Sequence, residues 1–552
     1  MKKILLLLSV LSLNQITAQT FTEPLPIPPT VTGTVFNLNV NESTYQFKPG
    51  NITNTYGVNA DYLGPTLIVN AGDFITLNVI NNLSVTTTMH WHGMHVPAVD
   101  DGGPHSVINP GETWSPDFEV KNKASVYWYH PHTMGLTNYQ ASMGAAGLIY
   151  VKDAEESALN LPRTYGVDDI PLVIQTKSFD ANNQIQISSN MDNVSMVNGE
   201  ISPYVDAPAQ MVRFRALNAS SSRTLNIGTD DNRTLYQISS DGGLLENPVP
   251  VTRILLSNGE RAEFLVDLTG ETVGNTFQFK SYMSEMPSNI EGGAGSAGHP
   301  NPLFGTDWSF MEVKVIAQTP SAITALPGTM TTLTPFLEGD ASVTRPMELS
   351  SNAKINGVSM DMNVINEVIE LGDTEIWTIT NVTPIAHPFH IHDVQFYILD
   401  RDNGGGPVAP SATESGLKDT VLVQSGEIVR VIAKFEDYAD PVIPYMYHCH
   451  NLIHEDNGMM GQFTVVDSSL ATSEVLSESI RIYPNPSFDY VTIESSEANN
   501  FQNIDLFDIS GKKIMTFLEG TKTLNISQLQ SGLYFLKIKT SKGELVKKII
   551  KS

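Results

Sequence analysis

Four histidine pairs with a two-residue spacing constrain this chain more than any other feature. The chain has 13 His among 552 residues, a content for which chance gives about 0.3 such pairs. In a β-strand alternate side chains point to the same face, so each pair offers two imidazoles from one strand. Neutral imidazole binds copper, zinc and iron. The sequence therefore predicts strands that carry eight potential metal ligands: His90, His92, His130, His132, His390, His392, His448 and His450.

Cys449, the only cysteine, lies inside one of these pairs, in the run HCHNLIHEDNGMM. The alternation of a strand points Cys449 away from the face that carries its two His neighbours. A thiolate, two His and a weak, long Met are the ligands of a blue-copper site. One His follows Cys449 five residues later and a Met ten residues later, while His387 stands apart from its neighbouring pair. The sequence predicts a mononuclear copper site made of His387, Cys449, His454 and Met459.

The blocks HWH, HPH, HPFHIH and HCHNLIH resemble the multicopper oxidase family of laccases, cuprous oxidases, bilirubin oxidases and ferroxidases. The resemblance covers roughly residues 40–467 and includes the runs VDDGGP and MGAAGLIYV. It implies one type 1, one type 2 and two type 3 coppers per chain. The type 1 copper would be held by His387, Cys449, His454 and Met459, the type 2 copper by His90 and His390, and the type 3 pair by His92, His130, His132, His392, His448 and His450.

The same resemblance implies a reaction and its proton supply. A small reducing substrate gives single electrons to the type 1 copper, and dioxygen is reduced to water at the other three. Asp101, in VDDGGP, and Glu455, directly after His454, match the family's acidic relay positions. Asp419, in LKDTVLV, is a weaker candidate for a partner near the type 1 site.

Three functions remain open on the sequence. The first is a laccase-like oxidase of phenols or aromatic amines. The second is a Cu(I) oxidase, but this function is weakened because residues 321–386 lack a Met-rich insert. The motif HCHNLIHED is also similar to that of bilirubin oxidases, so a tetrapyrrole substrate stays open. The third is a non-enzymatic scaffold, such as a cell-division protein, but members of that sort have lost ligands and this chain has lost none.

Composition favours an exported β protein. The net charge of −27 argues against nucleic acid as a partner. Residues 1–18, with Lys2, Lys3 and the run ILLLLSVLSL, predict a signal peptide, and no later stretch is apolar enough to span a bilayer. A single Cys excludes an intrachain disulfide.

Short alternating segments such as TLIVNAGDFITLNVIN and RAEFLVDL predict an all-β fold built of antiparallel sandwiches. We expect three cupredoxin-like Greek-key β-sandwich domains at residues 25–155, 160–320 and 340–467. The metal motifs lie only in the first and third, so the eight paired His should meet between those two. The second is expected to act as a spacer, and its Gly-rich loop at 287–306 suggests no role.

The tail differs from the body in composition. A Ser-rich linker at 468–479 leads into residues 480–552, which carry ten Lys or Arg against seven Asp or Glu. The tail resembles the C-terminal sorting domain of the type IX secretion system of Bacteroidetes. That resemblance implies a small β-sandwich, export through the periplasm by the secretion machinery, and a protein that is secreted or held at the cell surface. The alternative is a small carbohydrate- or protein-binding β module.

Overall fold

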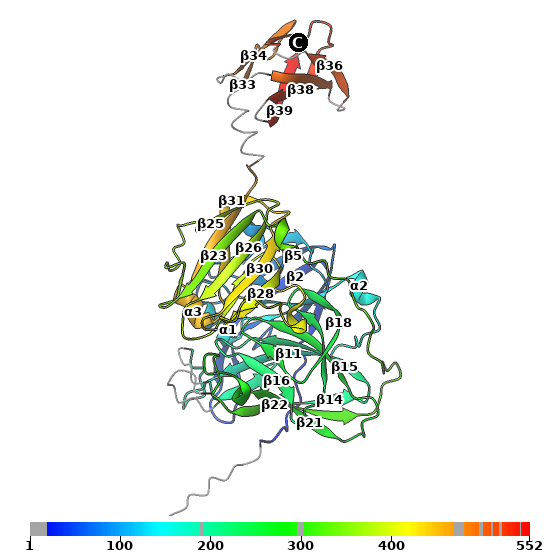
Figure 1. The fold of residues 1–552 in the computed structure, drawn as a ribbon, viewed down its shortest axis with the longest axis vertical. Coiled ribbons are helices and arrows are strands. Elements are labelled where there is room, and N and C mark those ends of the chain that lie inside the picture. Colours follow the sequence, from blue (N-terminus) through cyan, green and yellow to red (C-terminus); the bar gives the residue numbers. More distant parts are fainter. Residues whose placement is uncertain are drawn as a thin grey trace, which may run out of the picture. The chain divides into compact units, whose positions relative to one another are not determined.

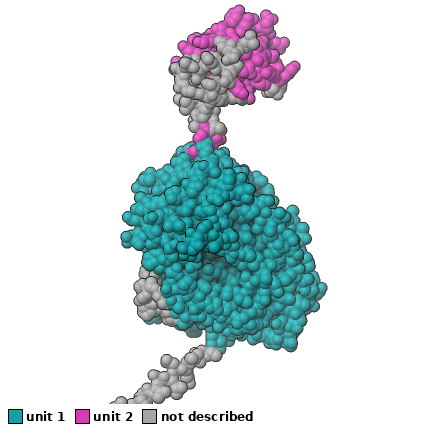
Figure 2. Space-filling view, in the orientation of Figure 1, with its two compact units in different colours: residues 1–464 teal, residues 465–552 magenta. Residues whose placement is uncertain are grey.

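The computed structural model describes residues 19–187, 192–294, 303–468, 480–495, 501–508, 512–517, 521–540 and 543–552. The predicted signal peptide and nearly all of the predicted linker lie outside these residues. The chain divides into two compact units, Met1–Thr464 and Val465–Ser552 (Figure 1, Figure 2). Strands dominate both units, which confirms the all-β fold class.

The first sandwich has two sheets. One has the order β1-β4-β10-β9-β6 and the other β3-β2-β5-β7, with β8 also paired to β5. The strands are β1 (Thr30–Thr32), β2 (Val35–Tyr45), β3 (Thr53–Val58), β4 (Thr66–Asn70), β5 (Phe74–Asn81), β6 (His90–His92), β7 (Thr113–Trp114), β8 (Asp117–Glu119), β9 (Ser125–His130) and β10 (Gly147–Lys152). Helix α1 (Thr137–Met143) lies between β9 and β10, and α2 (Ala154–Ser157) follows β10.

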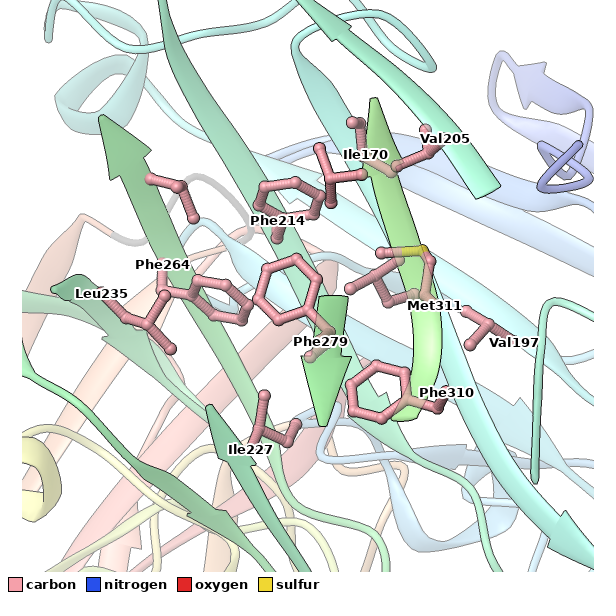
Figure 3. Close-up of a cluster of buried hydrophobic side chains, with 14 of the residues drawn as sticks. Ile170, Val197, Val205, Phe214, Ile227, Leu235, Phe264, Phe279, Phe310 and Met311 are labelled. Atoms are coloured by element: carbon pink, nitrogen blue, oxygen red, sulfur yellow. The ribbon is translucent and has the colours of Figure 1, made fainter. Parts of the chain in front are cut away.

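The second sandwich pairs a sheet of order β13-β12-β11-β15-β20-β17-β18 with one of order β14-β22-β21-β16-β19. Its core is rich in aromatic rings: Phe214, Phe264 and Phe279 meet with centroids 5.1–5.8 Å apart (Figure 3). The strands are β11 (Asp169–Lys177), β12 (Val194–Val197), β13 (Glu200–Ile201), β14 (Tyr204–Pro208), β15 (Met211–Asn218), β16 (Leu225–Thr229), β17 (Leu235–Ser240), β18 (Gly243–Val251), β19 (Ile254–Leu256), β20 (Arg261–Asp267), β21 (Thr276–Tyr282) and β22 (Asp307–Ile316).

The third sandwich pairs the sheets β24-β23-β26-β30-β28 and β25-β32-β31-β27-β29. Trp377 is its central core ring, with the rings of Tyr447 and Phe463 at 5.3 and 6.0 Å. Helix α3 (Leu452–Asp456) follows β31 directly. The strands are β23 (Val343–Ser350), β24 (Lys354–Ile355), β25 (Glu367–Glu370), β26 (Thr374–Asn381), β27 (His387–Ile391), β28 (Phe396–Asp402), β29 (Thr420–Val423), β30 (Ile428–Lys434), β31 (Asp440–Cys449) and β32 (Met460–Val466).

The expectation of purely antiparallel sandwiches is wrong in detail. Each of the three sandwiches contains parallel pairs, such as β2 with β5, β11 with β15 and β23 with β26. A parallel pair needs a crossover connection. Between β2 and β5 the chain leaves the sheet to form β4 in the opposite sheet, then returns beside β2 in the same direction.

The C-terminal unit has a three-stranded sheet, β33-β34-β37, and a four-stranded sheet, β36-β35-β38-β39. Ile504, Leu506, Leu536 and Ile538 are among its fully buried core residues. The strands are β33 (Ile480–Tyr483), β34 (Tyr490–Ser495), β35 (Phe501–Asp508), β36 (Lys513–Phe517), β37 (Thr523–Asn525), β38 (Gly532–Thr540) and β39 (Gly543–Lys551). Among the helices of the described residues, none has the length and apolar character needed to cross a membrane.

Candidate metal centres

Two antiparallel strand pairs align the histidine blocks. In the first sandwich β6 pairs with β9, and His90 lies opposite His130. In the third β27 pairs with β31, and His390 lies opposite His448. Only HWH lies wholly within a strand. In the other three blocks the second His of the pair lies one or two residues past the strand end, so the strand sets the direction of the first His and the following turn sets that of the second.

The eight paired His form one buried cluster, contributed by the first and third sandwiches. The rings of His90 and His392 stack at 3.8 Å, and those of His92 and His390 also stack at 3.8 Å. His132 Nε2 and His392 Nε2 each lie 3.2 Å from His448 Nε2. Each of the eight side chains is almost completely buried, so water cannot satisfy their ring nitrogens.

Four rings of this cluster each have one hydrogen-bonded nitrogen and one free nitrogen. His90, His130 and His390 each place Nδ1 2.8–2.9 Å from a backbone carbonyl, and their Nε2 atoms have no hydrogen-bond partner. His92 shows the opposite arrangement, with Nε2 on Asp419 and a free Nδ1. A hydrogen bond on one ring nitrogen fixes the tautomer and leaves the lone pair of the other for a metal. This donor set fits copper ions.

The protonation state of the cluster also suits metal binding. Burial, with the neighbouring imidazoles as the second cause, holds the pKa of each of the following residues well below the ordinary value of His: His92, His130, His132, His390, His392, His448 and His450. These imidazoles are neutral at neutral pH. Neutral imidazole is the form that binds metal ions.

A second, smaller group lies on the other side of β31. Cys449 Sγ is 3.4 Å from His387 Nδ1 and 3.6 Å from His454 Nδ1. Burial lowers the pKa of His387 to about 3 and that of His454 to about 4. Met459 is buried, and its carbonyl accepts a hydrogen bond from Cys449 N at 3.0 Å. His387, Cys449 and His454 thus lie together, and Met459 adjoins them through its backbone.

The two His of this group differ in exposure. His387 is 4% exposed, and its Nε2 lies 2.8 Å from the hydroxyl of Thr383. His454, in the short helix α3, is partly exposed. The edge of His454 is therefore the more accessible of the two to a molecule in solution.

Asp101 and Glu455 both contact the eight-His cluster. Asp101 Oδ2 accepts a hydrogen bond from His392 Nδ1 at 2.8 Å. Glu455 Oε1 is 3.5 Å from His132 Nδ1, and Oε2 is 3.2 Å from His448 Nδ1. Burial, followed by the nearby Asp456, raises the pKa of Glu455 well above its ordinary value. This burial favours the neutral, protonated form of Glu455 over the carboxylate.

Asp419 does not lie where the sequence analysis placed it. It contacts His92 and His390 of the eight-His cluster, at 3.1 and 3.6 Å, and not the residues around Cys449. The reason is strand pairing. β29 begins directly after Asp419 and pairs with β27 so that Thr420 lies opposite His390.

Two further His of the described residues, His95 and His105, contact other side chains and belong to neither group. His95 sits between two carboxylates, with Nδ1 2.7 Å from Asp393 and Nε2 3.1 Å from Asp437. Burial alone would lower its pKa, but these carboxylates raise the pKa of His95 to about 9. His105 Nε2 bonds the side chain of Gln462 at 2.8 Å. His299 lies outside the described residues.

Three residues near these groups were missed in the sequence: Arg261, Thr383 and Gly259. Arg261 and Thr383 contact Asp419 and His387, respectively. Gly259 lies against His450, and a Cβ there would come 2.9 Å from the ring. The sequence contained one signal for Arg261, a charged residue at the start of the segment RAEFLVDL, but it does not indicate which residue Arg261 contacts.

Comparison with known proteins agrees with this arrangement. Profiles of the multicopper oxidase family match residues 39–156 and 330–469, and a profile of the secretion system C-terminal sorting domain matches residues 481–552. The chain is 33% identical over 445 residues to the multicopper oxidase mco of Staphylococcus haemolyticus, covering 78% of this chain and 88% of that protein. It is also 32% identical to the cell division protein FtsP of Escherichia coli, covering 80% of this chain and 93% of that protein.

Among solved structures, a similar one is CueO, a laccase-like multicopper oxidase from the lignin-degrading bacterium Ochrobactrum sp., described as active towards lignin model compounds and lignosulfonate. The two share 34% identity with a TM-score of 0.72, over 80% of this chain and all of that one. The sorting-domain match indicates export by type IX secretion. The chain belongs to the multicopper oxidase family, copper-dependent oxidoreductases that use dioxygen.

Proposed function

We propose that this chain is a laccase-like oxidase that holds four coppers and transfers electrons from phenols or aromatic amines to dioxygen, producing water. His90 and His390 would hold the type 2 copper. The type 3 pair would be held by His92, His130, His132, His392, His448 and His450, and the type 1 copper by His387, Cys449, His454 and Met459. Asp101 and Glu455 would supply protons for the reduction of dioxygen.

One observation carries this proposal: within a complete donor set, four rings each turn a buried nitrogen without a hydrogen-bond partner towards the cluster. Buried polar atoms in folded proteins are nearly always hydrogen-bonded. Here His90 Nε2, His92 Nδ1, His130 Nε2 and His390 Nε2 are buried and unpartnered, while the opposite nitrogen of each ring is bonded. A bound metal explains four such exceptions in one place.

When bound, copper supplies the one-electron chemistry that imidazoles and thiols lack. The chain provides the path between the two groups, because Cys449 is covalently joined to His448 and His450, whose rings belong to the other group. Glu455 lies within 3.5 Å of two cluster histidines, and its burial favours the protonated form, so it is placed to deliver a proton there. The buried cluster excludes bulk water.

The accessible edge of His454 supports an organic reductant. A planar phenol can approach that edge, whereas the edge of His387 is closed by Thr383. Cu(I) is the second candidate reductant. Met360 and Met362 are partly exposed, and Met360 N bonds the carbonyl of Gly458, next to Met459. A bilirubin oxidase-like activity is the third.

A non-enzymatic role is the competing function class, because the cell division protein FtsP shares 32% sequence identity with this chain and the multicopper oxidase mco shares 33%. The donor set argues against it: every expected ligand is present, and the two groups are assembled. A scaffold has no need for eight buried imidazoles in one cluster.

Copper analysis and kinetics on purified, copper-loaded protein test this proposal. We expect about four coppers per chain and a blue colour. Oxygen uptake would then be compared with a simple phenol, Cu(I) and bilirubin, with Cys449→Ser protein as the control for non-enzymatic oxidation. The highest kcat/KM with the phenol supports the laccase-like assignment, and the highest value with Cu(I) replaces it. Zinc alone, or one copper per chain, would refute the oxidase.

We also propose that the protein acts outside the cell or on the surface of a Bacteroidetes-type bacterium. The sorting domain supports this location. An extracellular site would give the enzyme direct access to phenolic polymers and their fragments.

A further inference from the structure

The second sandwich reaches the eight-His cluster with one short segment. This segment is the turn between β19 and β20, residues 257–260, followed by Arg261 at the start of β20. Because no metal motif falls within the second sandwich, its predicted role was that of a spacer. The contacts of this segment indicate a different role.

Arg261 links all three sandwiches. Its side chain is 1% exposed, and its guanidinium donates to both oxygens of Asp419, from Nη1 at 2.7 Å and from Nη2 at 2.6 Å. Its Nε donates to the carbonyl of Val126, in β9, at 2.9 Å. A two-pronged pair of this kind fixes the orientation of the carboxylate as well as its position.

Asp419, held by Arg261, in turn orients two histidines by hydrogen bonds. Its Oδ1 accepts a hydrogen bond from His92 Nε2 at 3.1 Å, and its carbonyl accepts one from His390 Nδ1 at 2.8 Å. These bonds leave His92 Nδ1 and His390 Nε2 free on the cluster side. The two rings are stacked at 3.8 Å, so a rotation of one displaces the other.

The same segment sets the position of a third ring. Gly259 has φ +83°, and a Cβ at this position would lie 2.9 Å from His450 Cδ2. Glycine adopts this backbone conformation without strain and allows the turn to lie directly against the imidazole. The turn therefore packs its backbone against His450, while the ion pair of Arg261 and Asp419 holds His92 and His390.

We propose that Arg261 is a positioning residue of the trinuclear copper centre, acting through Asp419 on His92 and His390, and that the second sandwich is thereby part of the centre. This inference rests on the proposed copper assignment. Residues that orient metal-binding His through the outer ring nitrogen typically change metal affinity or activity by about 10- to 100-fold when mutated. Lysine keeps the charge of arginine but lacks the planar fork that holds both carboxylate oxygens.

The test is Arg261→Lys, with Arg215→Lys as a matched control. Arg215 is another buried Arg of the second sandwich, and it makes a similar two-pronged contact, from Nε and Nη2 to Asp169 at 2.6 and 2.7 Å. Its ion pairs are with Asp169 and Glu263, and neither is a cluster residue. Three properties would be compared in copper-loaded protein: the blue band, the type 2 EPR signal with the type 3 absorption, and the copper retained against a chelator.

We expect Arg261→Lys to keep the blue band and to lose type 2 and type 3 copper at about 10- to 100-fold lower chelator concentration than wild type. Arg215→Lys should show wild-type spectra and retention, even if both variants lower the unfolding temperature equally. The proposal is overturned if Arg261→Lys retains wild-type cluster spectra and chelator resistance, or if its losses match those of Arg215→Lys.

Asp419→Asn gives a second, independent test, and it carries the decision should Arg261→Lys not fold. Asp419→Asn should lose type 2 and type 3 copper and keep the blue band, because the amide cannot present two acceptors to the guanidinium. The double variant should be no worse than the single ones if the two residues act as a unit. Additive losses, or a wild-type cluster in Asp419→Asn, would contradict the proposal. A wild-type protein without four coppers would instead refute the proposed function and leave no centre for Arg261 to position.

Discussion

Glu455→Gln tests the proton supply of the cluster most directly. Glu455 is 1% exposed, in helix α3, with its two oxygens 3.5 and 3.2 Å from His132 Nδ1 and His448 Nδ1. Burial raises its pKa well above the ordinary value, which favours the protonated carboxyl, the form that can give up a proton. Glutamine has the same shape and keeps one oxygen as an acceptor, but it cannot release a proton in this way.

Two effects could slow the variant, and their sizes differ. Loss of a hydrogen-bonding partner behind a metal ligand costs about 10- to 100-fold. Loss of a positioned proton donor costs about 10²- to 10⁴-fold. Because the glutamine oxygen retains a contact to one of the two rings, the first effect should be small. We therefore expect reoxidation by dioxygen to fall at least about 100-fold.

Stopped-flow spectroscopy separates the two halves of the reaction. Anaerobic bleaching of the blue band reports electron uptake from the substrate and should keep its wild-type rate. Mixing the reduced Glu455→Gln protein with dioxygen should show a slow return of the blue band. Asp456→Asn is the control, since that neighbouring carboxylate accepts from Thr137 N and Asn138 N at 2.9 and 3.1 Å and contacts no cluster histidine. Because Asp456 helps to raise the pKa of Glu455, this variant should keep the proton donor and only move its pH dependence to lower pH.

The pH dependence gives a further check. In wild type the carboxyl is protonated below its raised pKa, so reoxidation should fall as the pH rises through that value. The Gln variant should lack this decline. If the variant bleaches slowly but reoxidises at the wild-type rate, Glu455 belongs to the substrate side and the relay assignment is wrong.

Four other outcomes are expected. Cys449→Ser should abolish the blue band and turnover while the fold persists, because a hydroxyl cannot replace a thiolate; full activity would refute the assignment. Met459→Leu should keep the blue site and raise its potential in a redox titration, and an unchanged potential would mean that Met459 is not a ligand. Thr383→Val should weaken copper retention at the mononuclear site by about 10- to 100-fold, with Thr383→Ser restoring it, because the hydroxyl orients His387; equal retention in both would contradict this. Deleting residues 468–552 should leave activity intact and block appearance outside the cell, as fractionation of the native host would reveal; normal export would remove the sorting role.

The sequence was informative where chemistry is local in the chain. The two-residue spacing in HWH predicted strand β6, and Cys449 between two His predicted two groups on opposite sides of one strand. Four blocks far apart in sequence were expected to meet because metal ligands must converge, and they do.

What escaped prediction depends on pairing between distant segments. Arg261 and Asp419 are 158 positions apart, and nothing in RAEFLVDL or LKDTVLV distinguishes a structural ion pair from one behind a metal site. The placement of Asp419 was wrong for the same reason, since it follows from the register of β29 on β27. The parallel strand pairs likewise follow from crossovers, which local periodicity does not encode.

The alternation along β31 has an evolutionary consequence. Phe389 lies opposite Cys449 and His390 lies opposite His448, so consecutive positions on this strand serve different centres. Inserting or deleting one residue here would exchange the faces and destroy both centres at once. Selection therefore cannot adjust the two centres separately by changing this strand. Divergence in substrate and potential must come from the surrounding positions, such as Thr383 and Met459, which can vary without altering the register.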